Sequence, residues 1–154
     1  MGKFVAETYY LLLRNGLIRD LDAYYYTPSS DNGLGGDMVY KAVTVGGAHA
    51  VCSTPQDRLV QLNTFAGCEM RIKGVQQQST VGKGILVLIT GVNIRTDGHI
   101  QQQQLPFCHT LILKPVLTTT AASFGVDPAA SAMTTPTIGY QILNDNLVIL
   151  TGDE

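Results

Sequence analysis

Charged residues are scarce in this chain. Lys and Arg (10) and Asp and Glu (12) make up 14% of the 154 residues, against 45% hydrophobic residues. The net charge of −2 and the pI of about 5.8 exclude a basic surface of the kind that binds nucleic acid. So apolar a chain is not of the disordered class, and it has fewer charges than an ordinary monomer's surface carries. We expect a single domain over residues 1–154 with a sizeable core and some apolar surface that faces a partner.

Long apolar runs are also absent. The longest aliphatic run, Ile85 to Ile89, is far too short to span a bilayer. Glu7 and Arg14 interrupt the apolar residues near the N-terminus, so no signal peptide is predicted. We therefore expect a cytoplasmic protein with no membrane partner.

Cysteine is rare, and Cys52, Cys68 and Cys108 are widely spaced and odd in number. We interpret them as reduced, buried thiols of an intracellular protein. Only Cys108 and His109 are adjacent, and neighbours on a strand point to opposite faces, so a zinc site is not predicted. The glycine-rich stretch 33–37 neither follows a strand nor opens a helix, so no phosphate loop is predicted. We expect no metal and no cofactor.

The first part of the chain has helical periodicity. A helix is predicted over residues 2–14, ended by Asn15-Gly16, and a second over residues 17–26. Thr54 and Pro55 predict the start of a third helix, with Thr as the N-cap and Pro at the first helical position. The residues expected on the buried helix faces are Val5, Tyr9, Leu12, Leu13, Leu17, Leu21, Tyr24, Tyr25, Leu59 and Leu62.

Strand patterns dominate after residue 66, and a short strand or hairpin is predicted earlier, over 38–47. Residues 68–73 alternate between apolar and charged side chains, as in a half-buried strand. Three more strands are predicted over 84–94, 105–115 and 139–150. This order is typical of an α+β fold in which three helices pack on one face of a curved antiparallel sheet.

The last three predicted strands are apolar on both faces. Residues 85–89, 111–113 and 147–150 contain no polar position. Three helices can cover only one face, and a wet apolar face costs about 25 cal/mol per Å². An apolar patch of that size normally marks an interface. The sequence therefore predicts a twofold homodimer through the sheet face.

Two polar segments and one insertion complete the pattern. The glutamine runs 76–78 and 101–104 fit solvated strand ends and turns. Residues 116–138 form a Thr/Ala-rich stretch with one charge, too long for a hairpin turn, and we expect it to be a mobile inserted loop.

Asn144 and Asp145 stand side by side within the last apolar strand. An ionised carboxylate in a sheet core costs several kcal/mol, roughly, unless it is paired or hydrogen-bonded. The two side chains should point to opposite faces, one toward the helices and one toward the sheet partner. We interpret both as structural hydrogen-bonding residues that set register at an interface, and not as catalysts.

Six segments, in chain order, resemble one family. They are FVAETYYLLL, LDAYYYTPSS, FAGCEMRIKGVQQQS, GILVLITG, FCHTLILKP and GYQILNDNLVIL. Together they cover nearly the whole chain and resemble the nuclear transport factor 2 family, most of all the N-terminal domain of the Ras-GAP SH3-binding stress-granule scaffold proteins. The resemblance implies a cone-shaped fold. The chain departs from the family pattern at His109, where Gln is usual, at Val148, where Arg often stands, and in the 116–138 insertion.

The resemblance implies a non-enzymatic, dimeric interaction domain of a ribonucleoprotein or stress-granule scaffold in mRNA metabolism. Relatives bind short Phe-containing motifs, such as FGDF or FxFG, in a groove between the first helices and the last strand. The matching positions here are Phe4 or Val5, Tyr24 or Tyr25, and Tyr140. Aromatic walls suit this task because they bury much apolar area and stack on a ligand ring. No direct nucleic-acid contact is predicted for this domain.

Two alternatives share the implied fold. The first is a nuclear transport carrier or mRNA-export cofactor that binds FG nucleoporins at the nuclear envelope or in the nucleus. The chain lacks Trp, which such carriers use, and offers only Asp97 among the acidic residues that hold Ran-GDP. The second is a small-molecule isomerase or dehydratase, with Asp145, His109 and Tyr140 as candidates. A lone His without a positioned partner is weak support for catalysis, so we favour a structural His109 and predict no catalytic residue.

Overall fold

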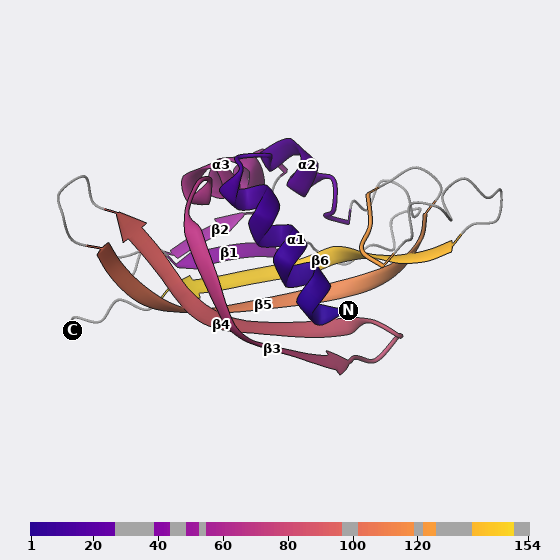
Figure 1. Ribbon diagram of the computed structural model, residues 1–154. Helices are drawn as coiled ribbons and strands as arrows, with labels where there is room; N and C mark the ends of the chain where they lie inside the picture. The colour runs from indigo at the N-terminus through magenta and orange to yellow at the C-terminus, as the bar shows by residue number, and fades with distance from the viewer. Residues whose placement is uncertain are drawn as a thin grey trace.

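Three helices lie on one side of a curved six-stranded sheet in the part of the chain that the structure describes (Figure 1). This computed structural model describes residues 1–26, 39–43, 49–52, 55–96, 102–118, 122–125 and 137–149. The helices are α1 (Gly2–Arg14), α2 (Ile18–Asp22) and α3 (Pro55–Phe65). The strands are β1 (Val39–Val43), β2 (His49–Cys52), β3 (Glu69–Ser79), β4 (Ile85–Thr96), β5 (Gln102–Thr118) and β6 (Thr137–Ile149). The predicted α+β class is confirmed.

The strands are ordered β2-β1-β6-β5-β4-β3. Neighbours pair antiparallel, as predicted, except β1 and β6, which run parallel with Val39 opposite Asn144. A parallel pair needs a long connection, and here the chain passes through β2, α3, β3, β4 and β5 before β6 returns beside β1. The prediction of a wholly antiparallel sheet is wrong at this one pair.

Helix α1 follows its sequence pattern. Val5, Tyr9 and Leu13 are buried against the sheet as predicted, and Ala6 and Tyr10 widen the buried face. After Arg14 the chain turns at Gly16, whose φ of 71° lies in the left-handed region that glycine tolerates.

Helix α2 is shorter than predicted. It ends at Asp22, and Leu17, expected on the buried face, is 46% exposed. The physical reason is a competing set of hydrogen bonds with β6. The Tyr26 N–H donates to the Ile142 carbonyl (2.9 Å), and the Ile142 N–H donates to the Tyr24 carbonyl (2.8 Å). Main-chain pairing with a strand excludes helical pairing for these residues.

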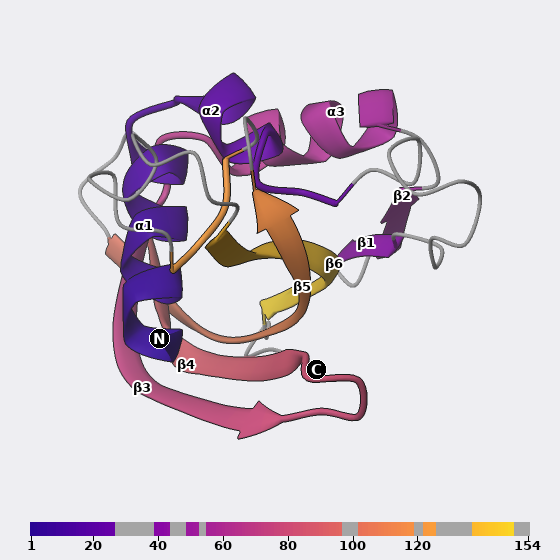
Figure 2. The same cartoon turned by 90° about the vertical axis from the view of Figure 1, so that its right-hand side faces the viewer.

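The sheet bends most strongly where β3 and β4 curl beneath α1 (Figure 2). A register shift between Ile72 and Gly74 marks a bulge at this place. Opposite Ile72 lies Gly91, where an added Cβ would stand 1.9 Å from the Arg71 carbonyl oxygen and 2.9 Å from the Phe107 ring. Only glycine allows the two strands to approach so closely.

The core lies between the helices and the inner face of the sheet. Val87, Ile89, Leu111 and Leu147 point inward and are at most 1% exposed. The outer face carries alternating positions of the same strands. Its cross-strand rows are Leu86–Ile112–Asn144, Leu88–Thr110–Asn146 and Thr90–Cys108–Val148. Most of these outer side chains are half-buried in the single chain, and apolar residues are prominent among them.

Three expectations need correction or fall outside the described residues. Val116–Thr118 belongs to β5, Thr137–Ile138 begins β6, and Phe124 is buried in the core, so these parts are not a mobile loop. Cys68 and Cys108 are free but only half-buried.

Some predicted features lie outside the described residues. They are the stretch 33–37, Thr54, Asp97 and the rest of 116–138. No helix within the described ranges has the length and apolar character needed to cross a membrane.

Candidate functional site

A buried polar cluster joins α1, the chain after α2, β5 and β6. Asp145 on β6 is its centre, because its Oδ1 lies 2.5 Å from His109 Nε2 on β5. Its Oδ2 accepts hydrogen bonds from the hydroxyls of Tyr9 (2.7 Å) and Tyr25 (2.5 Å). The Tyr10 hydroxyl lies 2.9 Å from His109 Nδ1. These five residues are called the polar cluster below.

The rings of the polar cluster pack on one another. Tyr9 meets His109 edge to face at 4.9 Å between centroids, and Tyr10 stacks on the same imidazole at 5.8 Å. With the imidazole proton on Nε2, His109 donates to Asp145 and accepts at Nδ1 from the Tyr10 hydroxyl. In that arrangement the groups satisfy each other's hydrogen-bonding capacity, as buried polar groups require.

The polar cluster is closed to solvent. His109 and Tyr9 are 0% exposed, Asp145 1%, Tyr25 2% and Tyr10 6%. The hollow of about 460 Å³ that opens beside α2 and α3 is lined by residues such as Leu17, Asp20 and Leu59, and by no member of the cluster. The side chain of Asp145 is therefore shielded from solvent by the residues packed around it.

Arg58 extends the cluster toward α3. Its Nε donates to Asp22 Oδ1 at 2.6 Å, and its guanidinium carbon lies 4.5 Å from the centroid of the Tyr25 ring. Arg58 is 5% exposed, so its charge is paired in a largely buried position, while Asp22 keeps partial contact with solvent. These contacts tie α3 to the segment that carries Tyr25.

A second candidate site lies at the edge of β6, where aromatic side chains gather. The Tyr24 and Phe124 rings stack at 4.5 Å with an interplanar angle of 27°. The Phe124 N–H donates to the Tyr140 carbonyl (2.8 Å), and the Tyr140 N–H donates to the Phe124 carbonyl (2.9 Å). We call Tyr24, Phe124 and Tyr140 the aromatic edge.

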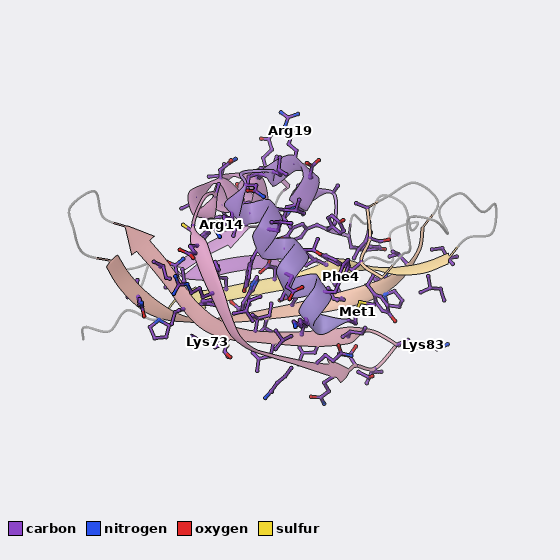
Figure 3. All side chains as sticks on the ribbon, in the orientation of Figure 1. Met1, Phe4, Arg14, Arg19, Lys73 and Lys83 are labelled. Atoms are coloured by element: carbon purple, nitrogen blue, oxygen red, sulfur yellow. The ribbon has the colours of Figure 1, made fainter. Side chains whose placement is uncertain are left out.

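The N-terminal end of α1 borders the aromatic edge. A Cβ added at Gly125 would stand 2.6 Å from Met1 Cε and 3.7 Å from Tyr140 Cδ2, so all three residues meet there. Phe4 is 56% exposed and follows Met1 by three residues, which places both on one side of the helix (Figure 3). Aromatic side chains are enriched at binding hot spots, so the exposed Phe4 ring is a candidate ligand contact.

Solved structures show which fold this is. The yeast Ubp3-associated protein Bre5 superposes with a TM-score of 0.60 at 15% identity, covering 96% of this chain and 92% of that one. Nuclear transport factor 2 from Cryptosporidium parvum gives 0.60 at 16% identity, covering 97% and 91%. A proposed dehydratase of the NTF2-like family from Streptomyces avermitilis gives 0.59 at 16%, covering 96% and 93%. No protein-family model matches the sequence, and no curated protein matches it.

The chain has the nuclear transport factor 2-like fold. The resemblance read from the six sequence segments is thereby confirmed at the level of fold. Identities this low establish the architecture alone, and the fold is shared by proteins whose descriptions differ widely.

Within the nuclear transport factor 2-like fold, the predicted groove positions are not equivalent. Phe4 is exposed and Val5 is 0% exposed, so Phe4 is the residue of that pair that can contact a ligand. Tyr25 is 2% exposed and bound to Asp145, which leaves Tyr24, half-buried, at the surface. Tyr140 is half-buried and main-chain bonded to Phe124. The inclusion of Val5 and Tyr25 as groove residues is corrected, since both belong to the core.

The polar residues of β6 lie as the strand alternation predicts. Asp145 faces the helices, whereas Asn144 is half-buried on the outer face in the row with Ile112 and Leu86. Tyr140, the third candidate of the isomerase alternative, lies at the aromatic edge, while tyrosines from α1 and the following chain surround Asp145.

Sequence reasoning missed three tyrosine hydroxyls, Arg58 and Phe124. Tyr9 and Tyr25 were assigned to apolar faces, although a buried tyrosine normally needs a partner for its hydroxyl. Applied together with the polar Asp145 and His109, this rule would have indicated that buried tyrosine hydroxyls bond to those two side chains. Among the described residues, no three His, Cys, Asp or Glu side chains are grouped to hold a metal ion.

Proposed function

We propose that this chain is a non-enzymatic, dimeric protein-interaction domain that binds short Phe-containing motifs of the FGDF or FxFG type at the aromatic edge. A cytoplasmic ribonucleoprotein or stress-granule scaffold is the setting that the sequence resemblance supports. The proposal rests on the contacts of Phe124. Its ring stacks on Tyr24, and its main chain forms hydrogen bonds with Tyr140.

The aromatic edge has the two parts that peptide recognition by strand addition needs. Main-chain hydrogen bonds supply affinity, and a side-chain pocket supplies specificity. The N–H and C=O groups of Tyr140 supply the first part, and the rings of Tyr24 and Tyr140 with the neighbouring Met1 supply the second. Offset stacking of two aromatic rings adds about 0.5–1.5 kcal/mol to the burial of their area.

Peptide binding tests the proposal directly. We expect labelled FGDF-type or FxFG-type peptides to bind the chain, and Tyr140→Ala to weaken binding about tenfold because ring contact with the ligand is lost. Fluorescence anisotropy measures both affinities. Leu11→Ala is the matched control, since Leu11 is 61% exposed on α1 and should have no effect.

Other outcomes of the peptide experiment decide against the proposal. Failure of both peptide classes to bind, or equal binding by the Tyr140 variant, would contradict the assigned site. Binding of Ran-GDP together with FxFG peptides alone would favour the carrier alternative, located at the nuclear envelope or in the nucleus.

The outer face of the sheet supports the dimer. Leu86, Leu88 and Ile112 stand in adjacent cross-strand rows, and the described helices all lie on the opposite face (Figure 1). Covering such a surface with a second copy removes apolar area from water at about 25 cal/mol per Å². Asn144, in the row of Ile112, can form hydrogen bonds across this interface and set its register.

A charge on the outer face is expected to separate the subunits. Wild-type chain should sediment at twice its 16.6 kDa mass, and Leu88→Glu at the mass of one chain, because the carboxylate would be buried unpaired at the interface. Analytical ultracentrifugation gives both masses. Val81→Glu, at a fully exposed turn position, serves as the control and should remain dimeric. A monomeric wild type at micromolar concentration would disprove the dimer.

One observation favours a second candidate function, a small-molecule isomerase or dehydratase. His109 and Asp145 lie in contact inside a fold that a proposed dehydratase shares. Against it, the polar cluster is 0–6% exposed, and its groups already bond to one another. The interaction domain therefore remains the better supported function.

A further inference from the structure

Within the aromatic edge, the position between Tyr24 and Tyr140 is already occupied by Phe124 of the same chain. We infer that Ala122–Gly125 is an internal ligand of this edge, and that a partner's Phe-Gly segment binds by taking its place. The inference rests on the proposed function and adds the regulation of that site.

The Phe124 side chain is seated as a ligand would be. It is 0% exposed and packs with the core cluster, although it belongs to the insertion that separates β5 from β6. Its ring contacts Tyr24, which projects from the chain segment after α2. A full aromatic side chain buried between distant segments matches the anchor residue of a peptide motif.

The backbone of Ala122–Gly125 adds to the sheet. Phe124 and Tyr140 exchange two main-chain hydrogen bonds as an antiparallel bridge, and the Gln141 side-chain amide donates to the Ala122 carbonyl at 3.0 Å. Within the described residues, β1 pairs with β6 from Asn144 to Val148 and so leaves the edge of β6 at Tyr140 to another segment. Strand addition at an open edge is the way extended peptides bind sheets.

The conformation of Gly125 determines which residue type fits directly after the phenylalanine at the aromatic edge. Its φ is +83°, which disfavours an L-residue with a Cβ by roughly tenfold. A Cβ there would also stand 2.6 Å from Met1 Cε, the movable end of a flexible side chain. The backbone therefore selects glycine after Phe, and the edge is complementary to a Phe-Gly pair.

An internal ligand lowers the apparent affinity for any partner. A tethered segment acts at an effective concentration in the millimolar range, roughly, and free peptide must compete with it. The apparent dissociation constant rises by the inverse of the fraction of chains with an open edge. Removing the Phe124 ring should raise that fraction without changing Tyr24 or Tyr140.

The test uses the segment itself as the probe. A fluorescein-labelled peptide with the sequence of residues 120–127, TAASFGVD, is titrated into the wild-type chain and into Phe124→Ala. We expect the variant to bind at least tenfold more tightly than wild type. The same peptide with Ala in place of Phe should not bind, and one with Ala in place of Gly should bind about tenfold more weakly. Leu117→Ala, at an exposed position near the end of β5, is the matched control and should behave as wild type.

Hydrogen exchange on the wild-type chain provides a second readout that does not depend on the variant's folding. Saturating Phe-Gly peptide should leave the Tyr140 amide protected, because a new strand replaces the old one, while the Phe124 amide loses protection. Equal peptide affinity of wild type and Phe124→Ala, or a Phe124 amide that stays protected with peptide bound, would overturn the inference.

Motif peptides separate failure of the inference from failure of the proposed function. If FGDF and FxFG peptides bind wild type and Phe124→Ala equally well, the internal ligand is excluded and the proposed function stands. If Phe124→Ala binds TAASFGVD but neither motif peptide, the proposed function fails and the edge serves only the chain's own segment.

Discussion

Asp145→Ala is expected to lower the free energy of unfolding by about 3–5 kcal/mol, the loss typical of removing one partner from a buried charged network. The substitution leaves the hydroxyls of Tyr9 and Tyr25 and the Nε2 of His109 without their acceptor, at positions that are at most 2% exposed. Each buried donor left unsatisfied costs about 1–3 kcal/mol. Urea denaturation followed by circular dichroism measures the change.

Two companion variants test this explanation. Asp145→Asn keeps the shape and one acceptor oxygen, so it should lose markedly less stability and leave peptide binding largely unchanged. Asn144→Ala, the neighbour on the outer face, should change the unfolding free energy of the isolated chain by less than about 1 kcal/mol. Equal effects of Asp145→Ala and Asn144→Ala would show that the polar cluster does not stabilise the fold. Loss of a chemical reaction in Asp145→Asn would instead support the enzyme alternative.

Gly91→Ala is expected to destabilise the fold by about 3 kcal/mol, because the new methyl group has no space. The added Cβ would stand 1.9 Å from the Arg71 carbonyl oxygen, which belongs to the sheet backbone and cannot rotate away. The Phe107 ring at 2.9 Å closes the other side. Strands β3 and β4 would have to separate where the sheet bends (Figure 2).

Gly74→Ala is the matched control for Gly91→Ala, since it lies at the same bulge on the facing strand. The nearest atom to its added Cβ is Thr90 Oγ1 at 3.1 Å, the end of a side chain that can rotate. We expect a loss of about 1 kcal/mol or less. Thermal unfolding of both variants gives the comparison, and similar melting temperatures would refute the close strand approach as the reason for glycine at position 91.

The elements with a strong local pattern were predicted well. The period of Val5, Tyr9 and Leu13 predicted α1, and the continuous apolar runs after residue 84 predicted β4, β5 and β6. Local patterns failed where main-chain partners lie far away in sequence. Tyr24 and Tyr26 continue a helical pattern, yet their backbone pairs with Ile142.

The proposed dimer face was also inferred from local pattern, through strands without polar positions. The same reasoning could not identify the groove members. Val5 and Tyr25 matched the groove by sequence position, but a shift of one residue along α1, or along the segment after α2, decides whether a side chain meets solvent or core. The structure places both inside and leaves Phe4 and Tyr24 toward the surface.

By itself the sequence determined the α+β class, the apolar sheet and the opposite orientation of Asn144 and Asp145, because period and alternation are local properties of a chain. Only the tertiary structure decided that Asp145 meets Tyr9, 136 residues away in sequence, and that Phe124 reaches Tyr24 and Tyr140. Such long-range contacts depend on the strand register and on how α1 crosses the sheet, and both are set by the packing of the whole core.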